Sequence, residues 1–173
     1  PTIYKYLLEN IKLNNFENVA TFNLALGEKN AQVNFSNFKS DDRNRILNLK
    51  SKLGIKMSKL DDLPIEETTI DLLKIDTIGY EKFVLFGASL LLKKCKVVQI
   101  PIGGTYHKLS KYYGYEFKEI INFLQKNNFR IYSYDQKKSL SEILNYKIPA
   151  RGDLLAIADI NNFITKTGWV ISC

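Results

Sequence analysis

An aspartate at the end of a short apolar run is the residue whose type and position best fit chemistry. The run is L-L-K-I at residues 72–75, and Asp76 follows it directly, before a turn at Gly79. Such a run is typical of a central strand covered on both faces. In open α/β sheets, ligands bind beyond the carboxyl ends of the strands, which makes Asp76 a candidate catalytic residue. The alternative is that its carboxylate caps the helix expected to begin at Tyr80.

The chain contains one histidine, His107, in the segment G-T-Y-H at residues 104–107. We expect this segment to be a loop after a strand end. An imidazole titrates near neutral pH, so His107 is a second candidate catalytic residue, as a general base, and a plain surface residue is the alternative. Tyrosines gather in the same region, where they line a pocket for a planar acceptor such as a sugar, pack as a lid, or lie exposed in the loop: Tyr106, Tyr112, Tyr113 and Tyr115.

The composition is that of one globular domain. The chain has 173 residues, of which 45% are hydrophobic and 25% charged. We find no apolar run of the roughly 18–20 residues that a membrane span requires, and we expect no leader peptide. The two cysteines, Cys95 and Cys173, form neither a disulfide framework nor a metal-ligand spacing. We therefore expect a buried thiol at Cys95, no metal, and a reducing, cytoplasmic setting.

The net charge of +7 raises the question of a nucleic-acid partner. The lysines are spread along the whole chain rather than gathered in one run. We therefore predict a solvated basic surface and no nucleic-acid partner.

Hydrophobic periodicity predicts helices that alternate with short strands. In the first helix, Ile3, Leu7 and Ile11 recur at the spacing of one helical face. The predicted helices cover residues 2–14, 80–94 and 117–126. The predicted strands cover residues 19–26, 31–35, 55–60, 72–75, 97–100, 129–134 and 154–158, with a polar loop over 37–52 and a flexible turn over 101–105.

This order of elements predicts an α/β fold with a doubly wound, mainly parallel sheet. The last two predicted strands have no helix between them, so we expect an antiparallel strand at the C-terminal end. The chain has no G-x-G-x-x-G motif and no P-loop, because the glycine pair at residues 103–104 lacks the required spacing.

Three groups of residues match the motifs of one known family, in the same order along the chain. They are L-N-N-F-E-N-V at 13–19 with A-L-G at 25–27, K-L-D-D-L at 59–63, and K-I-D-T-I-G-Y-E at 74–81 with V-L-F-G-A at 84–88. On these residues the chain resembles the FkbM-type methyltransferases, a branch of the Rossmann-like class that uses S-adenosylmethionine. The resemblance covers nearly the whole chain and implies a single methyltransferase-like domain over residues 1–173.

The resemblance also implies that part of the full fold is missing. In that class, the first strand, its glycine-rich loop and the end of the second strand bind the cofactor. Pro1 matches the end of the segment that follows them. We therefore expect the C-terminal portion of a Rossmann-like fold, with the N-terminal strands missing.

The site residues implied by the resemblance lie at two strand ends. Asn23, Ala25 and Leu26 would lie near the adenine of S-adenosylmethionine, and Asp76 would lie beside the methyl donor and the acceptor. The implied reaction is methyl transfer to a hydroxyl of a sugar or small molecule.

Two positions depart from the family pattern. Ile78 and Pro101 stand where the family usually or often has a glutamate. Two functions therefore stay open, an active methyltransferase and an inactive methyltransferase-like remnant or binding module.

Overall fold

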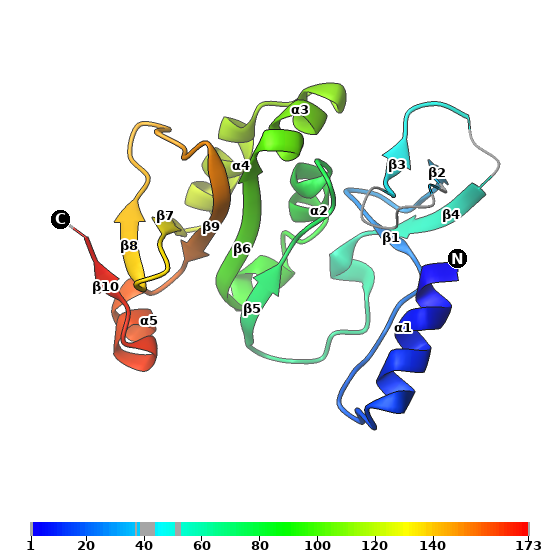
Figure 1. The fold of residues 1–173 in the computed structure, drawn as a ribbon, viewed down its shortest axis with the longest axis horizontal. Helices are drawn as coiled ribbons and strands as arrows, with labels where there is room; N and C mark the ends of the chain where they lie inside the picture. The colour runs from blue at the N-terminus through cyan, green and yellow to red at the C-terminus, as the bar shows by residue number, and fades with distance from the viewer. Residues whose placement is uncertain (1, 37, 39–43, 51–52, 173) are drawn as a thin grey trace.

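Two β-sheets with helices packed around them make up the protein in a computed structural model (Figure 1). The structure describes residues 2–36, 38, 44–50 and 53–172. One sheet has six strands in the order β10-β8-β7-β9-β6-β5, and the other has four in the order β1-β4-β2-β3. Within the described ranges, no helix is both long enough and apolar enough to cross a bilayer.

The six-stranded sheet is mixed. β5–β6 and β10–β8 pair in parallel, whereas β6–β9, β9–β7 and β7–β8 pair antiparallel. Its strands are β5 (Ile70–Lys74), β6 (Cys95–Gly103), β7 (Arg130–Tyr134), β8 (Ser139–Glu142), β9 (Arg151–Ile157) and β10 (Val170–Ile171).

The prediction of a doubly wound, mainly parallel Rossmann-like sheet is therefore wrong. Helical crossovers give parallel strands, and among the predicted strand–helix–strand units β5 and β6 pair in this way. Residues 135–138 join β7 to β8, and so short a connection can join only antiparallel neighbours. The strands before residue 60 form a second, largely antiparallel sheet instead of extending the first.

In the four-stranded sheet, β1 (Ala25–Leu26) lies parallel to β4 (Leu53–Ser58). β4 pairs antiparallel with β2 (Ala31–Phe35), whose bounds match the predicted strand, and β3 (Ile46–Leu47) lies at the edge. Of the strand predicted over 19–26, only the last two residues pair. Part of the predicted polar loop, residues 37, 39–43 and 51–52, lies outside the described residues.

Two helices have the predicted bounds or nearly so. They are α1 (Thr2–Leu13) and α4 (Phe117–Lys126), the second of which begins with a capping box between Glu116 and Glu119. The helix predicted over residues 80–94 is divided. α2 (Glu81–Phe86) ends at Gly87, and a 3₁₀ turn, η3 (Leu91–Lys94), follows.

Two helices were not predicted, α3 (Gly104–Tyr112) and α5 (Ile160–Thr167). The glycine pair before α3 indicated a flexible turn, but β6 continues to Gly103. There a φ of +75° turns the chain directly into the helix, and a side chain on Gly103 would overlap the carbonyl oxygen of Ala150. The glycine therefore marks a sharp strand-to-helix corner.

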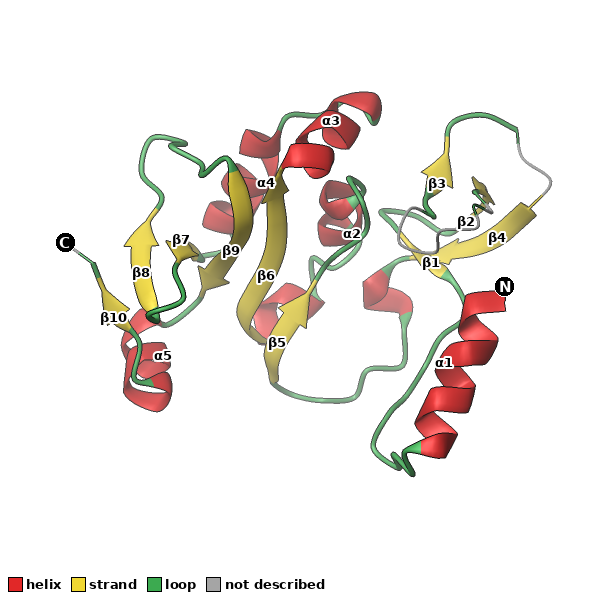
Figure 2. Cartoon of the chain, in the orientation of Figure 1, coloured by secondary structure: helices red, strands yellow, loops and turns green. Residues whose placement is uncertain are grey.

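Both faces of the six-stranded sheet bury apolar residues. On one face, α2 and α4 cover the larger core, which includes Val98, Ile100 and Leu154, and α4 passes behind the sheet in Figure 2. On the other face, residues of α5 pack on Val97 and Tyr132. Cys95 is buried as predicted, and burial raises the pKa of its thiol to about 11.

The two sheets meet where Gly27, just after β1, touches Gly87, just after α2. A methyl group on Gly87 would overlap the carbonyl oxygen of Gly27, so the two backbones are in direct contact. Asp61, in the 3₁₀ turn η2 (Leu60–Asp62), stabilises the same contact through hydrogen bonds. Its amide donates to the Gly87 oxygen at 2.9 Å, and its carboxylate accepts from the amides of Leu90 and Leu91 at 2.9 and 2.8 Å. We call these contacts the sheet junction.

Replacement of Gly87 by alanine tests the sheet junction. The added methyl group has no space, and overpacking of this kind costs about 1–3 kcal/mol. We expect Gly87→Ala to lower the free energy of unfolding by that amount in urea titrations. Gly54→Ala is the matched control, because nothing lies within 4 Å of its Cβ position. Equal stability of the two variants would contradict the direct backbone contact.

Candidate functional site

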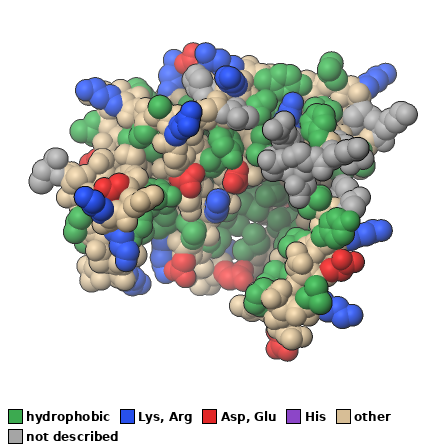
Figure 3. Space-filling view, in the orientation of Figure 1, with side chains coloured by type: hydrophobic (Ala, Val, Ile, Leu, Met, Phe, Trp, Pro, Cys, Tyr) green, Lys and Arg blue, Asp and Glu red, His purple; other side chains and the backbone are tan. Residues whose placement is uncertain are grey.

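A cavity of about 660 Å³ lies between α1, the four-stranded sheet and the turn that follows β5. That volume is typical of a small-molecule site. Figure 3 shows the surface hollowed between α1 and the six-stranded sheet, with apolar side chains deep in the hollow. The wall is mainly apolar with polar groups at a few points: Ile3, Tyr6, Asn23, Leu24, Ala25, Leu26, Phe35, Ser36, Phe38, Asn44, Arg45, Ile46, Leu53, Ile55, Asp76, Thr77, Ile78 and Tyr80.

Asp76 lies at the rim of this cavity, just beyond the carboxyl end of β5. The hydroxyl of Tyr106 on α3 donates to its Oδ1 at 2.7 Å, and Lys74 Nζ lies 3.8 Å from its Oδ2. The carboxylate stays 41% exposed. Burial, together with the hydrogen bond to Asp76, raises the pKa of Tyr106. Asp76 is thus an accessible carboxylate with a fixed orientation.

The alternative interpretation of Asp76 as a helix cap is wrong. The N-cap residue of α2 is Tyr80, and no side chain accepts a hydrogen bond there. The side-chain contacts of Asp76 go to Tyr106 and Lys74 instead.

The side chain of Glu81, which is only 1% exposed, stabilises the turn between Asp76 and α2. Glu81 Oε1 accepts from the amides of Thr77 and Gly79, both at 3.0 Å. The hydroxyl of Tyr115 donates to the Gly79 oxygen at 2.8 Å and lies 3.3 Å from Glu81 Oε2. Burial raises the pKa of Glu81, against these hydrogen bonds, which lower it. We call this arrangement the turn clamp.

The turn clamp fixes an unusual backbone. Ile78 has a φ of +53° and Gly79 a φ of +89°. Glycine adopts such angles freely, but for a β-branched residue the left-handed region costs roughly 1–2 kcal/mol. A side chain on Gly79 would overlap Leu109 of α3, so α3 packs directly on the turn.

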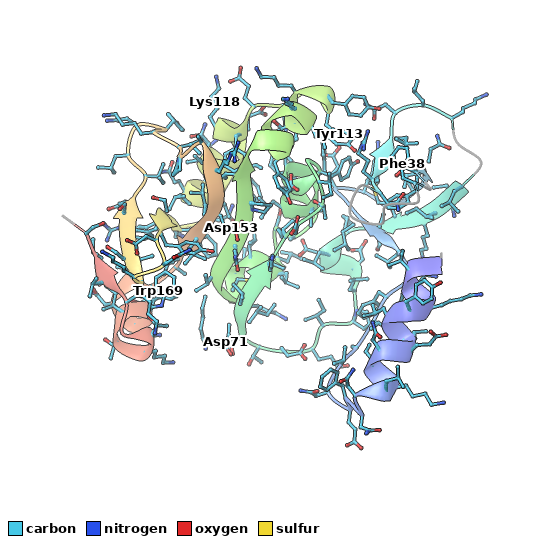
Figure 4. All side chains as sticks on the ribbon, in the orientation of Figure 1. Phe38, Asp71, Tyr113, Lys118, Asp153 and Trp169 are labelled. Carbon is cyan, nitrogen blue, oxygen red and sulfur yellow. The ribbon has the colours of Figure 1, made fainter. Side chains whose placement is uncertain are left out.

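A cluster of aromatic side chains lies next to the site, on the side of α3. Tyr80 packs at 4.5 Å from Phe83 and at 5.0 Å from Tyr113, measured between ring centroids. Tyr113, whose hydroxyl donates to the Ile46 oxygen at 2.6 Å, links α3 to the four-stranded sheet, and Figure 4 shows it on the side that faces Phe38.

The structure brings four of the predicted site residues to one cavity. Asn23, Ala25, Leu26 and Asp76 all line it, although they lie some 50 residues apart in the chain. His107 lies on α3 rather than in a loop, next to Tyr106, and its side chain is outside the described part. Tyr106, Tyr112, Tyr113 and Tyr115 are not among the residues that line this cavity, so the pocket alternative for them does not hold here.

Several residues of the site had no clear signal in the sequence. The role of Glu81 depends on its burial, although an acidic residue at the first position of a short helix could have indicated a hydrogen bond back to the preceding turn. Arg45, whose guanidinium lies 5.5 Å from the Phe38 ring, comes from the stretch predicted as a polar loop. Within the described residues, no group of three or more acidic, histidine or cysteine side chains could hold a metal ion.

Substitution of Glu81 tests the turn clamp. Glu81→Ala leaves the Thr77 and Gly79 amides without an acceptor, at a cost of about 1–3 kcal/mol for a buried donor. Glu81→Gln keeps an acceptor oxygen and should remain folded. Because the folded-state pKa of Glu81 is raised above its ordinary 4.5, its contribution to stability is greatest below that pH and falls as pH rises through the folded-state pKa.

Urea unfolding at several pH values measures this effect. The free energy of unfolding of Glu81→Gln, minus that of the wild type, should increase from about pH 4 to about pH 8. A difference that stays constant over this range would contradict the raised folded-state pKa of Glu81.

Comparison with known proteins agrees with the motifs in the sequence. The Methyltransferase FkbM domain matches residues 1–131, which include the sheet junction, the turn clamp and every cavity residue. No curated protein and no solved structure matches the chain. The match covers well over half of the 173 residues and indicates methyltransferase activity. The chain therefore belongs to the FkbM methyltransferase family.

Proposed function

We propose that the protein transfers a methyl group from S-adenosylmethionine to a hydroxyl of a sugar or other small molecule bound in the cavity. The observation that carries this proposal is the position of Asp76 at the rim of a cavity of about 660 Å³ that Asn23, Ala25 and Leu26 also line. Family membership supports the class of reaction. The cofactor and the acceptor are the proposed parts.

Several residues of the cavity wall support S-adenosylmethionine as the proposed cofactor. Its sulfonium and ammonium groups are cationic, and Asp76 is a carboxylate within the cavity wall. The side-chain amide of Asn23 and the backbone of Ala25 and Leu26 offer donors and acceptors for an adenine edge, with Leu24 as an apolar neighbour. When bound, the cofactor supplies an activated methyl group, so the protein mainly aligns the acceptor.

Asp76 is proposed to orient the acceptor hydroxyl and to take its proton. Tyr106 holds Oδ1 at 2.7 Å, and the carboxylate still has free acceptor positions at its exposed side. Lys74 Nζ lies 3.8 Å from Oδ2 and places a cation beside this carboxylate. Aligned groups of this kind raise the rate by holding the reacting atoms in place.

His107 is the second proposed base. It follows Tyr106 on α3, and the Tyr106 hydroxyl donates to Asp76. We also place the reaction in the cytoplasm, a setting that a free, buried thiol at Cys95 suits.

Replacement of Asp76 tests the proposal. We expect Asp76→Asn to lower kcat by about 10²–10⁴, because the amide cannot accept the proton. The measurement is the formation of S-adenosylhomocysteine with a panel of hydroxylated acceptors. His107→Asn would show a comparable loss if His107 shares the role of base.

Asp71→Asn is the matched control. Asp71 lies on the same strand, at the end away from the cavity, and its side chain is 88% exposed (Figure 4). It should keep wild-type activity. Calorimetry of S-adenosylmethionine with the purified protein tests the cofactor separately. An Asp76→Asn protein as active as the wild type would refute the role of Asp76, and no heat of binding in the wild type would refute the cofactor.

A further inference from the structure

Ile78 stands apart from the other residues with left-handed backbone angles. Among described non-glycine residues, positive φ values occur at three asparagines and at unbranched Lys138 and Tyr146, whereas Ile78 alone is β-branched. Asparagine adopts this conformation readily and β-branched residues resist it. Asparagine or glycine at position 78 would therefore suit the backbone better than isoleucine does.

The surroundings prevent the turn from relaxing. The amides on both sides of Ile78, those of Thr77 and Gly79, donate to the buried Glu81 at 3.0 Å each. Leu109 of α3 packs against Gly79 from the side. The position of the Ile78 side chain is consequently set by the turn clamp and not by its own preference.

The Ile78 side chain does not contribute to either hydrophobic core. Tyr80, Leu73 and Leu26 are among the partly buried residues that pack against the larger core, but Ile78 is in neither core nor packed against one. It lines the cavity instead, where the wall also includes Ile3, Leu24 and Ile55. Its apolar surface therefore faces the ligand space rather than the protein interior.

We propose that Ile78 determines specificity, by selecting acceptors whose hydroxyl is attached to an apolar body, such as an aromatic or aliphatic alcohol. Ile78 lies two residues from Asp76, so the apolar part of the acceptor would lie against Ile78 while its hydroxyl reaches the Asp76 carboxylate. This inference rests on the proposed function for the transfer step. The binding preference itself requires no cofactor.

The experiment uses 2-naphthol as the apolar alcohol and methyl α-glucopyranoside as the polar one, both measured by calorimetry without cofactor. The wild type should bind 2-naphthol more tightly than the glucoside. Ile78→Asn should weaken 2-naphthol about tenfold, since loss of apolar contact in a pocket changes affinity by at least that order. Ile78→Val keeps most of the apolar surface and should weaken 2-naphthol less than Ile78→Asn does.

Thermal unfolding separates specificity from folding. Ile78→Asn and Ile78→Gly should raise Tm by about 1–4 °C, because they relieve the backbone. Lys138 is an exposed residue between β7 and β8 with a φ of +62°. Lys138→Asn should therefore also raise Tm, but it should leave 2-naphthol binding unchanged. Better stability with poorer binding is the combination that a purely structural residue would not produce.

Three results would overturn the inference. They are equal 2-naphthol affinity in Ile78→Asn and wild type, a wild-type preference for the glucoside, and a fall in Tm for both Ile78→Asn and Ile78→Gly. Failure of the proposed function would give a different experimental result. In that case the wild type would not bind S-adenosylmethionine, while the comparison of 2-naphthol affinities would still stand.

Discussion

The contact between Gly27 and Gly87 is the constraint on which the arrangement of this protein depends. A side chain at position 87 would overlap the carbonyl oxygen of Gly27, and a side chain at position 27 would overlap Met57. The carboxylate of Asp61 stabilises the chain beyond Gly87 by accepting hydrogen bonds from two amides. The contact sets the distance between the two sheets. It also explains physically why A-L-G, L-D-D and F-G-A belong to the motifs of one family, because these three segments meet at one place. The cavity lies close to this contact, because Leu26, the residue before Gly27, lines it.

The short helix α2 connects this junction to the candidate site. Its first residue, Glu81, holds the turn that carries Ile78, and the residue after its last turn, Gly87, makes the junction. Only six residues along the chain separate these two contacts. Lys82, the second residue of α2, adds a further anchor, since its ammonium group pairs with Glu119 of α4 at 2.8 Å. The site is thus positioned by the same element that joins the sheets.

Local patterns in the sequence predicted individual elements better than their assembly. The apolar spacing of α4 and the alternation of β2 describe single elements, and both were confirmed. The pairing of β7 with β8 and of β2 with β4 depends on contacts between strands. The hydrophobic periodicity of a single segment carries no information about such contacts, so the predicted parallel sheet was wrong. The site shows the same division. Asp76 could be found from its place after an apolar run, whereas the hydrogen bond from Tyr106 and the burial of Glu81 arise only in the folded chain.

The left-handed conformation of Ile78 has a consequence for how this sequence can evolve. A substitution of Ile78 by asparagine or glycine would increase the free energy of unfolding. Without selection for ligand binding, lineages would therefore lose isoleucine at this position. Orthologues that keep a β-branched residue there would record continued selection by the ligand, and those that lose it would mark the points where the substrate changed. The residue at position 78 would thus indicate where in a family tree the substrate changed.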